Sequence, residues 1–187
     1  MGAPRRVSQA RAVAEVAELA RTRSGETAFV GVDGPGGAGK STFARRLARA
    51  VTGAAVVSVD DFSGPGFDEW DWDRFAAQIV APLLAGRTAR YQLWDWSRDE
   101  GGPWHDVAAG TLVIVEGVSS TRREVALTWA LRIWVETPRE LRHARALERD
   151  GPQMTARWHE RWIPSEEAYI AAQHPQERAD LIVPGDE

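Results

Sequence analysis

Gly34-Pro35-Gly36-Gly37-Ala38-Gly39-Lys40-Ser41 matches G-x-x-x-x-G-K-[ST], the pattern of a phosphate-binding loop, or P-loop. The apolar, β-prone run 28–32 stands directly before this loop and predicts a buried strand. Residues 42–50 follow it with helix formers and with apolar side chains at helical spacing, which predicts a helix. Strand, loop and helix therefore come in the order that the motif requires.

The residue types in this loop suit the binding of an anion. Glycines let successive backbone N–H groups turn inward around a phosphate, and the helix that follows points its positive end at the same place. In this geometry Lys40 would reach the β- and γ-phosphates of a nucleotide, and Ser41 would bind Mg²⁺. The residues expected to bind the nucleotide are Gly34, Gly36, Gly37, Ala38, Gly39, Lys40, Ser41 and Thr42.

A glycine-rich turn before an ordinary helix is the alternative interpretation of this stretch. Lys40 argues against that alternative, because it is the only lysine in the chain and arginine is used at every other strongly basic position. The one lysine stands where a compact, flexible ammonium is useful.

Composition limits the class of protein. The 187 residues, with 43 % hydrophobic and 27 % charged side chains, suit one α/β domain spanning 1–187. The net charge of −4 argues against general binding to nucleic acid or to an anionic membrane. Cysteine is absent, the first residues do not resemble a signal peptide, and no run approaches the ~20 apolar residues of a membrane helix. We therefore expect a cytoplasmic protein. Because the chain has no asparagine, the base-reading Asn-Lys-x-Asp motif of GTPases is excluded.

Hydrophobic periodicity and turn residues predict the remaining elements. Helices are expected over 8–23, 73–84, 124–131, 138–150, 155–163 and 165–173. Strands are expected over 54–59, 111–115, 131–135 and 179–184, and loops over 63–72 and from the end of segment 91–98 to 106. Apolar strands that alternate with helices predict an α/β fold: a P-loop NTPase three-layer α/β/α sandwich with a mostly parallel sheet.

Carboxylates follow two of the predicted strands. Asp60-Asp61-Phe62 ends the second strand and Glu116-Gly117 ends the third. Because ligands of open α/β sheets bind beyond the carboxyl ends of the strands, these side chains should share a cleft with the P-loop. One carboxylate could accept a proton from an attacking hydroxyl, and others could hold Mg²⁺. Helix capping by the aspartates, or a solvated glutamate at a strand end, is the alternative.

Tryptophans gather in the middle of the chain. Five of the nine lie between residues 70 and 104, among Gly, Pro and Asp. Packing in the core and an aromatic-lined pocket for a phosphate acceptor are both open interpretations.

Arginines repeat along the predicted helix 138–150. Arg142, Arg145 and Arg149 are spaced three and four residues apart, so they share one face. They form either a solvated charged face or a clamp for the phosphates of ATP and for the transferring group.

This order of motifs resembles the uridine kinase branch of the P-loop kinases, which also contains phosphoribulokinase and bacterial pantothenate kinase. The resemblance runs from about residue 28 to residue 185. Asp60-Asp61-Phe62 resembles the family's Asp-x-Phe, whose first Asp serves as base and Mg²⁺ partner. Phe67-Asp68 resembles the Phe-Asp that opens the acceptor helix, whose Asp holds ribose hydroxyls. Val115-Glu116-Gly117 resembles the apolar-Glu-Gly ending whose Glu binds Mg²⁺.

Three further segments carry the resemblance. Segment 91–98 resembles the pocket motif Tyr-Asp-x-x-x-His-x-Arg, which implies that Tyr91, Trp96 and Arg98 contact the acceptor. Gln92 stands in place of the family's Asp, and Trp96 stands in place of its base-reading His. Arg142, Arg145, Arg149 and Asp150 match the arginine spacing of the family's lid, expected here over about 139–163. Residues 179–183 resemble the final strand beside the adenine site.

The resemblance implies an ATP-dependent kinase that uses Mg²⁺ and phosphorylates a hydroxyl of a small molecule, with a nucleoside as the first candidate acceptor. Asp60, Lys40, Arg142, Arg145 and Arg149 are the implied catalytic residues, and Ser41, Glu116 and Asp60 the implied metal ligands. A same-fold kinase for a pantothenate-like alcohol, a sugar or an antibiotic is an alternative, and a nucleotide-binding protein without turnover is another. No nucleic-acid or membrane partner is expected, and a homo-oligomer stays open.

Overall fold

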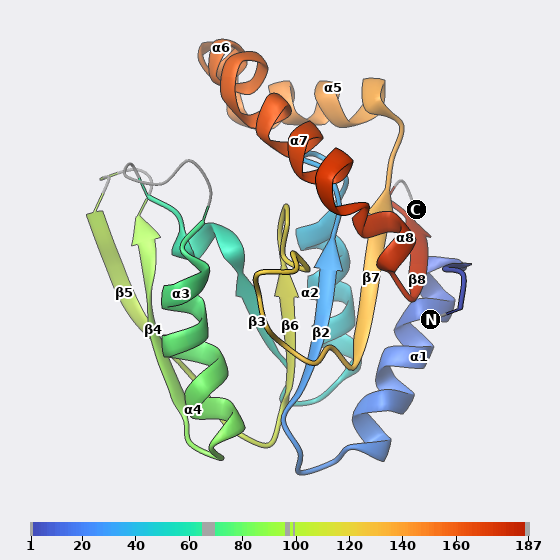
Figure 1. The fold of residues 1–187 in the computed structure, drawn as a ribbon, viewed down its shortest axis with the longest axis vertical. Coiled ribbons are helices and arrows are strands. Elements are labelled where there is room, and N and C mark those ends of the chain that lie inside the picture. Colours follow the sequence, from blue (N-terminus) through green and yellow to red (C-terminus); the bar gives the residue numbers. More distant parts are fainter. Residues whose placement is uncertain (1, 65–69, 96–97, 99, 186–187) are drawn as a thin grey trace.

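The computed structural model describes residues 2–64, 70–95, 98 and 100–185. At its centre lies a parallel sheet of six strands in the order β1-β8-β7-β2-β6-β3 (Figure 1). The strands are β1 Arg5–Arg6, β2 Ala28–Asp33, β3 Ala55–Ser58, β6 Leu112–Glu116, β7 Leu131–Glu136 and β8 Leu181–Pro184. The predicted parallel α/β sandwich is confirmed. Among the described strands of this sheet, only the two-residue β1 was not predicted.

Helices α1, Gln9–Thr22, and α2, Lys40–Ala50, cover one face of this sheet. The sequence explains which side chains they meet, because successive residues of a strand point to opposite faces. Val30 and Val32 of β2 pack with Phe43 and Leu47 of α2 in one core. Phe29, directly before Val30, points to the other face and packs into a second core there.

The second core lies under a helix and a hairpin. The helix consists of α3 Trp72–Phe75, a π-helical turn Ala76–Val80 and α4 Ala81–Leu84, close to the predicted helix 73–84. The hairpin pairs β4 Ala89–Asp95 with β5 Glu100–Val107 in a separate antiparallel sheet. The predicted polar loop up to residue 106 is therefore wrong. Because β5 is mostly exposed, its sequence lacks the apolar alternation that marks a half-buried strand, and pairing with β4 alone makes it extended.

The predicted helix over 124–131 is also wrong. The segment between β6 and β7 has no helix over these residues and crosses the sheet in front of β2 (Figure 1). It lies flat because Gly31 leaves room for it: a Cβ at that position would stand 2.4 Å from Thr121 and 3.3 Å from the ring of Trp129. The Ala130 N–H donates to Phe29 O at 2.9 Å. Contacts with a distant strand thus override local helix propensity.

The last third of the chain, which includes the segment 139–163 predicted as a lid, is mostly helical and returns to the sheet. Its helical elements are α5 Arg139–Asp150, a 3₁₀ turn Pro152–Met154, α6 Thr155–Arg157, a π-helical turn Trp158–Trp162, α7 Ile163–Gln173 and α8 Pro175–Arg178. The helices predicted over 155–163 and 165–173 are continuous through Pro164. Proline has no backbone N–H to donate, and the π-helical turn directly before it changes the hydrogen-bonding pattern so that the helix continues. In Figure 1, α5 and α6 lie above the carboxyl ends of the strands. None of the helices in the part of the chain that the structure describes is both long and apolar enough to span a membrane.

Candidate active site

The P-loop runs from the end of β2 into α2. Gly37 and Gly39 have φ values of 74° and 94°, in the left-handed region that favours glycine. Close contacts add a second reason for glycine, because a Cβ at Gly37 would stand 2.3 Å from the carbonyl oxygen of Arg142. Within the described part of the chain, no side chain caps α2 at Gly39. The N–H groups of its first turn therefore have no intrahelical partner and suit an anion.

Lys40 is buried at the start of α2. Its Nζ donates to Pro35 O at 2.9 Å, so the side chain folds back along the loop. Burial lowers the pKa of Lys40, and this effect is opposed by four carboxylates, those of Glu116, Asp33, Asp60 and Glu166. The ammonium therefore lies on the P-loop within electrostatic reach of these four carboxylates.

Ser41 and Glu116 come together from the loop and from the end of β6. Ser41 Oγ donates to Glu116 Oε2 at 3.1 Å. Burial raises the pKa of Glu116, against the opposing charge of Lys40. A hydroxyl beside a carboxylate is an oxygen donor set that suits Mg²⁺, which commonly binds one or two protein carboxylates and completes its shell with water and substrate phosphates. Among the described residues, no group of three or more Asp, Glu or His side chains is placed to hold a metal ion.

Asp60 lies in a 3₁₀ turn, Val59–Phe62, directly after β3. Ser58 caps this turn by accepting the Asp60 N–H at 3.4 Å, and β3 pairs with β6 so that Ser58 stands opposite Glu116. The charge of Asp60 acts on both Lys40 and Glu116. Asp60, the predicted base and metal partner, is exposed and lies within electrostatic reach of both groups.

Asp61 and the hairpin form the adjoining wall. Tyr91 is buried, stacks on Phe62 with ring centroids 5.4 Å apart, and pairs across the hairpin with His105, whose ring centroid is 6.0 Å away. Burial, helped by the charge of Asp60, raises the pKa of Asp61 to about 6, while His105 opposes this. Burial also raises the pKa of Tyr91 to about 12. His105 was not predicted, because finding it requires the register of a strand that the sequence does not reveal.

We expect Asp61→Asn to change how the free energy of unfolding depends on pH. The pKa of Asp61 is raised to about 6 from 3.8, so the folded state holds this proton more tightly than the unfolded chain. The stabilisation is full below the unfolded pKa and is lost as pH rises through the folded one. Urea unfolding without Mg²⁺ should show the wild type losing stability relative to Asp61→Asn between pH 4 and 7. Parallel curves for the two proteins would contradict the assignment.

The other residues predicted to contact the acceptor are not gathered in one place by the described part of the structure. Asp68 and Trp96 lie outside the described residues. Arg98 is exposed and pairs with Glu100 at 3.0 Å. Among the tryptophans, Trp70 is buried and donates to Ser119 Oγ at 3.0 Å, whereas Trp104 is half exposed on the hairpin. The tryptophan-rich region thus supplies both core and surface.

Of the arginines predicted to form a clamp, Arg142 contacts the P-loop, with Nη1 3.4 Å from Gly36 O. Arg142 Nη1 donates to Glu166 Oε1 at 2.7 Å, and Arg145 Nη1 donates to Gly185 O at 3.0 Å. Arg149 pairs with Asp150 at 2.6 Å. The hydrogen bond to Asp150 and, more weakly, the charges of Asp150 and Asp60 raise the pKa of Arg149. This guanidinium is therefore within electrostatic reach of the candidate base.

Asp33 lies buried below the P-loop, and its role was not predicted from the sequence. It is buried at the end of β2, where its carboxylate accepts five hydrogen bonds. The donors are Gly34 N at 2.7 Å, Ser119 N at 3.0 Å, Thr121 N at 3.1 Å, Thr121 Oγ1 at 2.6 Å and Tyr169 Oη at 2.6 Å. One buried charge therefore ties the P-loop to the loop after β6 and to α7.

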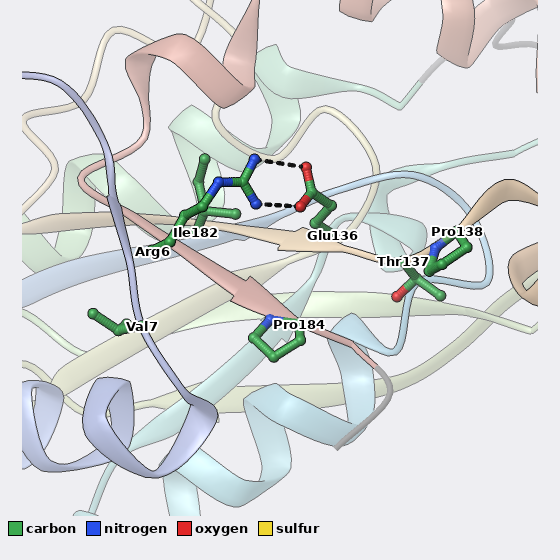
Figure 2. Close-up of a pocket in the computed structure, with 7 residues that line it drawn as sticks. All are labelled: Arg6, Val7, Glu136, Thr137, Pro138, Ile182 and Pro184. Atoms are coloured by element: carbon green, nitrogen blue, oxygen red, sulfur yellow. Dashed lines mark hydrogen bonds and ion pairs between the residues drawn. The ribbon is translucent and has the colours of Figure 1, made fainter.

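A cavity of about 410 Å³ lies at the ends of β7 and β8 (Figure 2). Arg6 and Glu136 form an ion pair across it, and Ile182, Pro138 and Pro184 supply apolar walls. Thr137, also in its lining, donates to Ala38 O of the P-loop at 3.0 Å. The cavity therefore adjoins the P-loop, on a different side from the hairpin with Tyr91.

The structure combines a parallel sheet, a P-loop after a central strand, strand-end carboxylates beside this loop and the arginine-bearing helix α5 above it. The chain has the fold of the uridine kinase-like P-loop kinases, as comparison with solved structures shows. No protein-family model matches the chain, and no curated protein sequence matches it.

Three solved structures illustrate this similarity. A candidate uridine kinase from Bacillus stearothermophilus has a TM-score of 0.67 and 18 % identity, over 92 % of this chain and 99 % of that one. A candidate fructose transport system kinase from Silicibacter sp. TM1040 has a TM-score of 0.75 and 23 % identity, over 94 % and 98 %. YFH7 from Saccharomyces cerevisiae, a candidate P-loop kinase with a circular permutation, has a TM-score of 0.58 and 11 % identity, over 97 % and 100 %. Identities this low show the fold.

Proposed function

We propose that this protein is an ATP-dependent kinase that transfers the γ-phosphate to a hydroxyl of a small molecule. The observation that carries the proposal is the meeting of Ser41 and Glu116 beside the buried Lys40, with the Asp60 carboxylate exposed next to them. Phosphoryl transfer needs a cradle for the phosphates, a cation, oxygen ligands for Mg²⁺ and a group that orients the acceptor. The P-loop backbone would supply the cradle, Lys40 the cation, Ser41 and Glu116 the oxygen ligands, and Asp60 the orienting group. A cytoplasmic location, where ATP is plentiful, belongs to the same proposal.

The residues take the following parts. Asp60 accepts the proton of the acceptor hydroxyl as its oxygen bonds to the γ-phosphorus, and the bond from that phosphorus to the β–γ bridging oxygen breaks, so that ADP leaves. Lys40 and the lid arginines stabilise the charge on the transferring group. Ser41 and Glu116 would hold Mg²⁺, whose chemical contribution is to neutralise the β- and γ-phosphate oxygens.

A nucleoside is the acceptor that we propose first. Tyr91 and His105, beside Asp60 and Asp61, offer an aromatic wall together with polar groups, which suits a ring that carries hydroxyls. The candidate uridine kinase with the same fold supports this choice.

A sugar is the second candidate, and a specific observation favours it. Gln92 stands where the resemblance implies an acceptor-binding Asp, but its amide donates to Gly102 O at 3.0 Å inside the hairpin. Its side chain therefore stabilises the hairpin and offers less to a pyrimidine. The candidate fructose transport system kinase has the same fold.

ADP formation with Mg-ATP tests the proposal. The purified protein is assayed with uridine, cytidine, other nucleosides, pantothenate, simple sugars and aminoglycosides, each against a reaction without acceptor. We expect ADP formation well above the blank with a nucleoside. Turnover with only a sugar or another alcohol would keep the kinase and replace its acceptor. Tight Mg-ATP binding with no acceptor-dependent ADP would contradict the kinase and favour a nucleotide-binding protein.

A further inference from the structure

Helix α7 touches the P-loop through two side chains that lie one turn apart. Tyr169 donates to Asp33 at the start of the loop, and Glu166 Oε2 accepts the Gly36 N–H at 2.5 Å. Residues three apart on a helix share a face, so α7 presents both groups to the loop at once. The ring of Trp158 covers Gly36 as well, since a Cβ there would stand 2.7 Å from it.

Glu166 also holds an arginine of the lid. Its Oε1 accepts a hydrogen bond from Arg142 Nη1 at 2.7 Å, and the same nitrogen approaches Gly36 O at 3.4 Å. The side chains of Arg142 and Glu166 are only 12 % and 4 % exposed. One carboxylate therefore joins α5, α7 and the backbone of the P-loop.

The next residue of α7 provides a natural comparison. Glu167 pairs with Arg139 of α5 at 3.1 Å, but these side chains are 54 % and 59 % exposed. An exposed pair of this kind contributes little, because solvent screens it. Removing one partner of a buried pair instead leaves a charge without compensation. The two helices thus carry a buried pair on the P-loop and an exposed pair away from it.

We infer that Glu166 is a positioning residue, which sets the guanidinium of Arg142 on the P-loop before the nucleotide binds. The inference rests on the proposed function. A guanidinium carries five N–H donors, so the contacts with Glu166 and Gly36 O leave donors for the transferring phosphoryl group. A charge that is already in place when the reaction begins stabilises the transition state without reorganisation. Glu166 itself acts only through Arg142.

Glu166→Gln tests this role, with Glu167→Gln as the matched control. The probe is Mg-ATP alone, with water as the acceptor, so no acceptor need be known. Glutamine keeps an oxygen for the Gly36 N–H but loses the charge that orients Arg142. We expect kcat for ADP formation to fall about tenfold or more while KM for ATP changes less than about threefold. Glu167→Gln should match the wild type in both constants.

A double-mutant cycle shows whether Glu166 acts through Arg142. Arg142→Gln removes the guanidinium, so adding Glu166→Gln should slow the reaction no further. If the two substitutions instead lower kcat by factors that multiply in the double variant, the inference is overturned. If Glu166→Gln alone fails to fold, as thermal unfolding will show, the comparison of the double variant with Arg142→Gln decides, because the double variant buries no unpaired charge. A wild type that binds no Mg-ATP overturns the proposed function. A wild type that binds it, with Glu166→Gln behaving like Glu167→Gln, overturns only this inference.

Discussion

Lys40→Ala is expected to reduce ADP formation by about 10³-fold or more. The ammonium is buried beside the P-loop carbonyl of Pro35, and no other lysine exists in the chain to replace it. Without it the β- and γ-phosphates lose a cation both in the bound state and in the transition state, so Mg-ATP affinity should fall as well. Burial already lowers the pKa of Lys40, which means that the charge is costly to the folded state. Its removal should therefore leave the unfolding temperature close to that of the wild type.

The matched control for this variant is Arg49→Ala, which removes an exposed cation from the last turn of the same helix. ADP formation by acceptor assay and thermal unfolding are measured for both proteins. Arg49→Ala should retain activity. Undiminished turnover in folded Lys40→Ala would end the kinase proposal in its present form.

Asp60→Asn is expected to lower kcat by about 10² to 10³-fold while Mg-ATP binds within a few-fold of its wild-type affinity. An amide of the same shape cannot take the proton of the acceptor hydroxyl. The side chain is exposed after β3 and is not part of the core, so the fold should persist. Steady-state ADP formation gives kcat, and titration with a fluorescent ATP analogue gives the affinity.

Asp73→Asn serves as the control, because Asp73 is an exposed acid in the first turn of α3. It should behave as the wild type does. If added Mg²⁺ restores the rate of Asp60→Asn, the carboxylate acts as a metal partner and not as the base. If Asp60→Asn has the full wild-type kcat without added Mg²⁺, Asp60 has no part in the mechanism.

The elements that the sequence predicts best are those with a strong local pattern. The P-loop motif needs only neighbouring residues, and the parallel strands are continuous apolar runs, so both are confirmed. The predictions for β5 and for segment 124–131 were wrong because both conformations depend on contacts outside the segment itself. Strand β5 is extended because it pairs with the neighbouring β4, and segment 124–131 packs beside Gly31, which is distant in the sequence. Local propensity carries no information about such partners.

Some residues of the candidate site could be predicted from the sequence, and others could not. Ser41, Asp60 and Glu116 follow predicted elements, and the parallel sheet brings their ends to one edge. Asp33 and Glu166 were missed, because Asp33 meets Thr121 at a separation of 88 residues and Glu166 meets Gly36 at a separation of 130 residues in the sequence. An aspartate at a strand end and a glutamate on a charged helix look ordinary in the sequence. Their burial among N–H donors gives them importance, and burial of this kind comes only from the assembled fold.

One measurement tests the central claim most directly: the fate of the γ-phosphate in a reaction of the wild-type protein with Mg-ATP labelled at that position. The label is followed in the presence of the nucleoside and sugar acceptors, with Lys40→Ala as the blank. The account predicts that the label moves to a hydroxyl of an acceptor and that ADP forms in equal amount. Label that stays in ATP, or that leaves only as inorganic phosphate with every acceptor, would contradict the assignment of this chain as a small-molecule kinase.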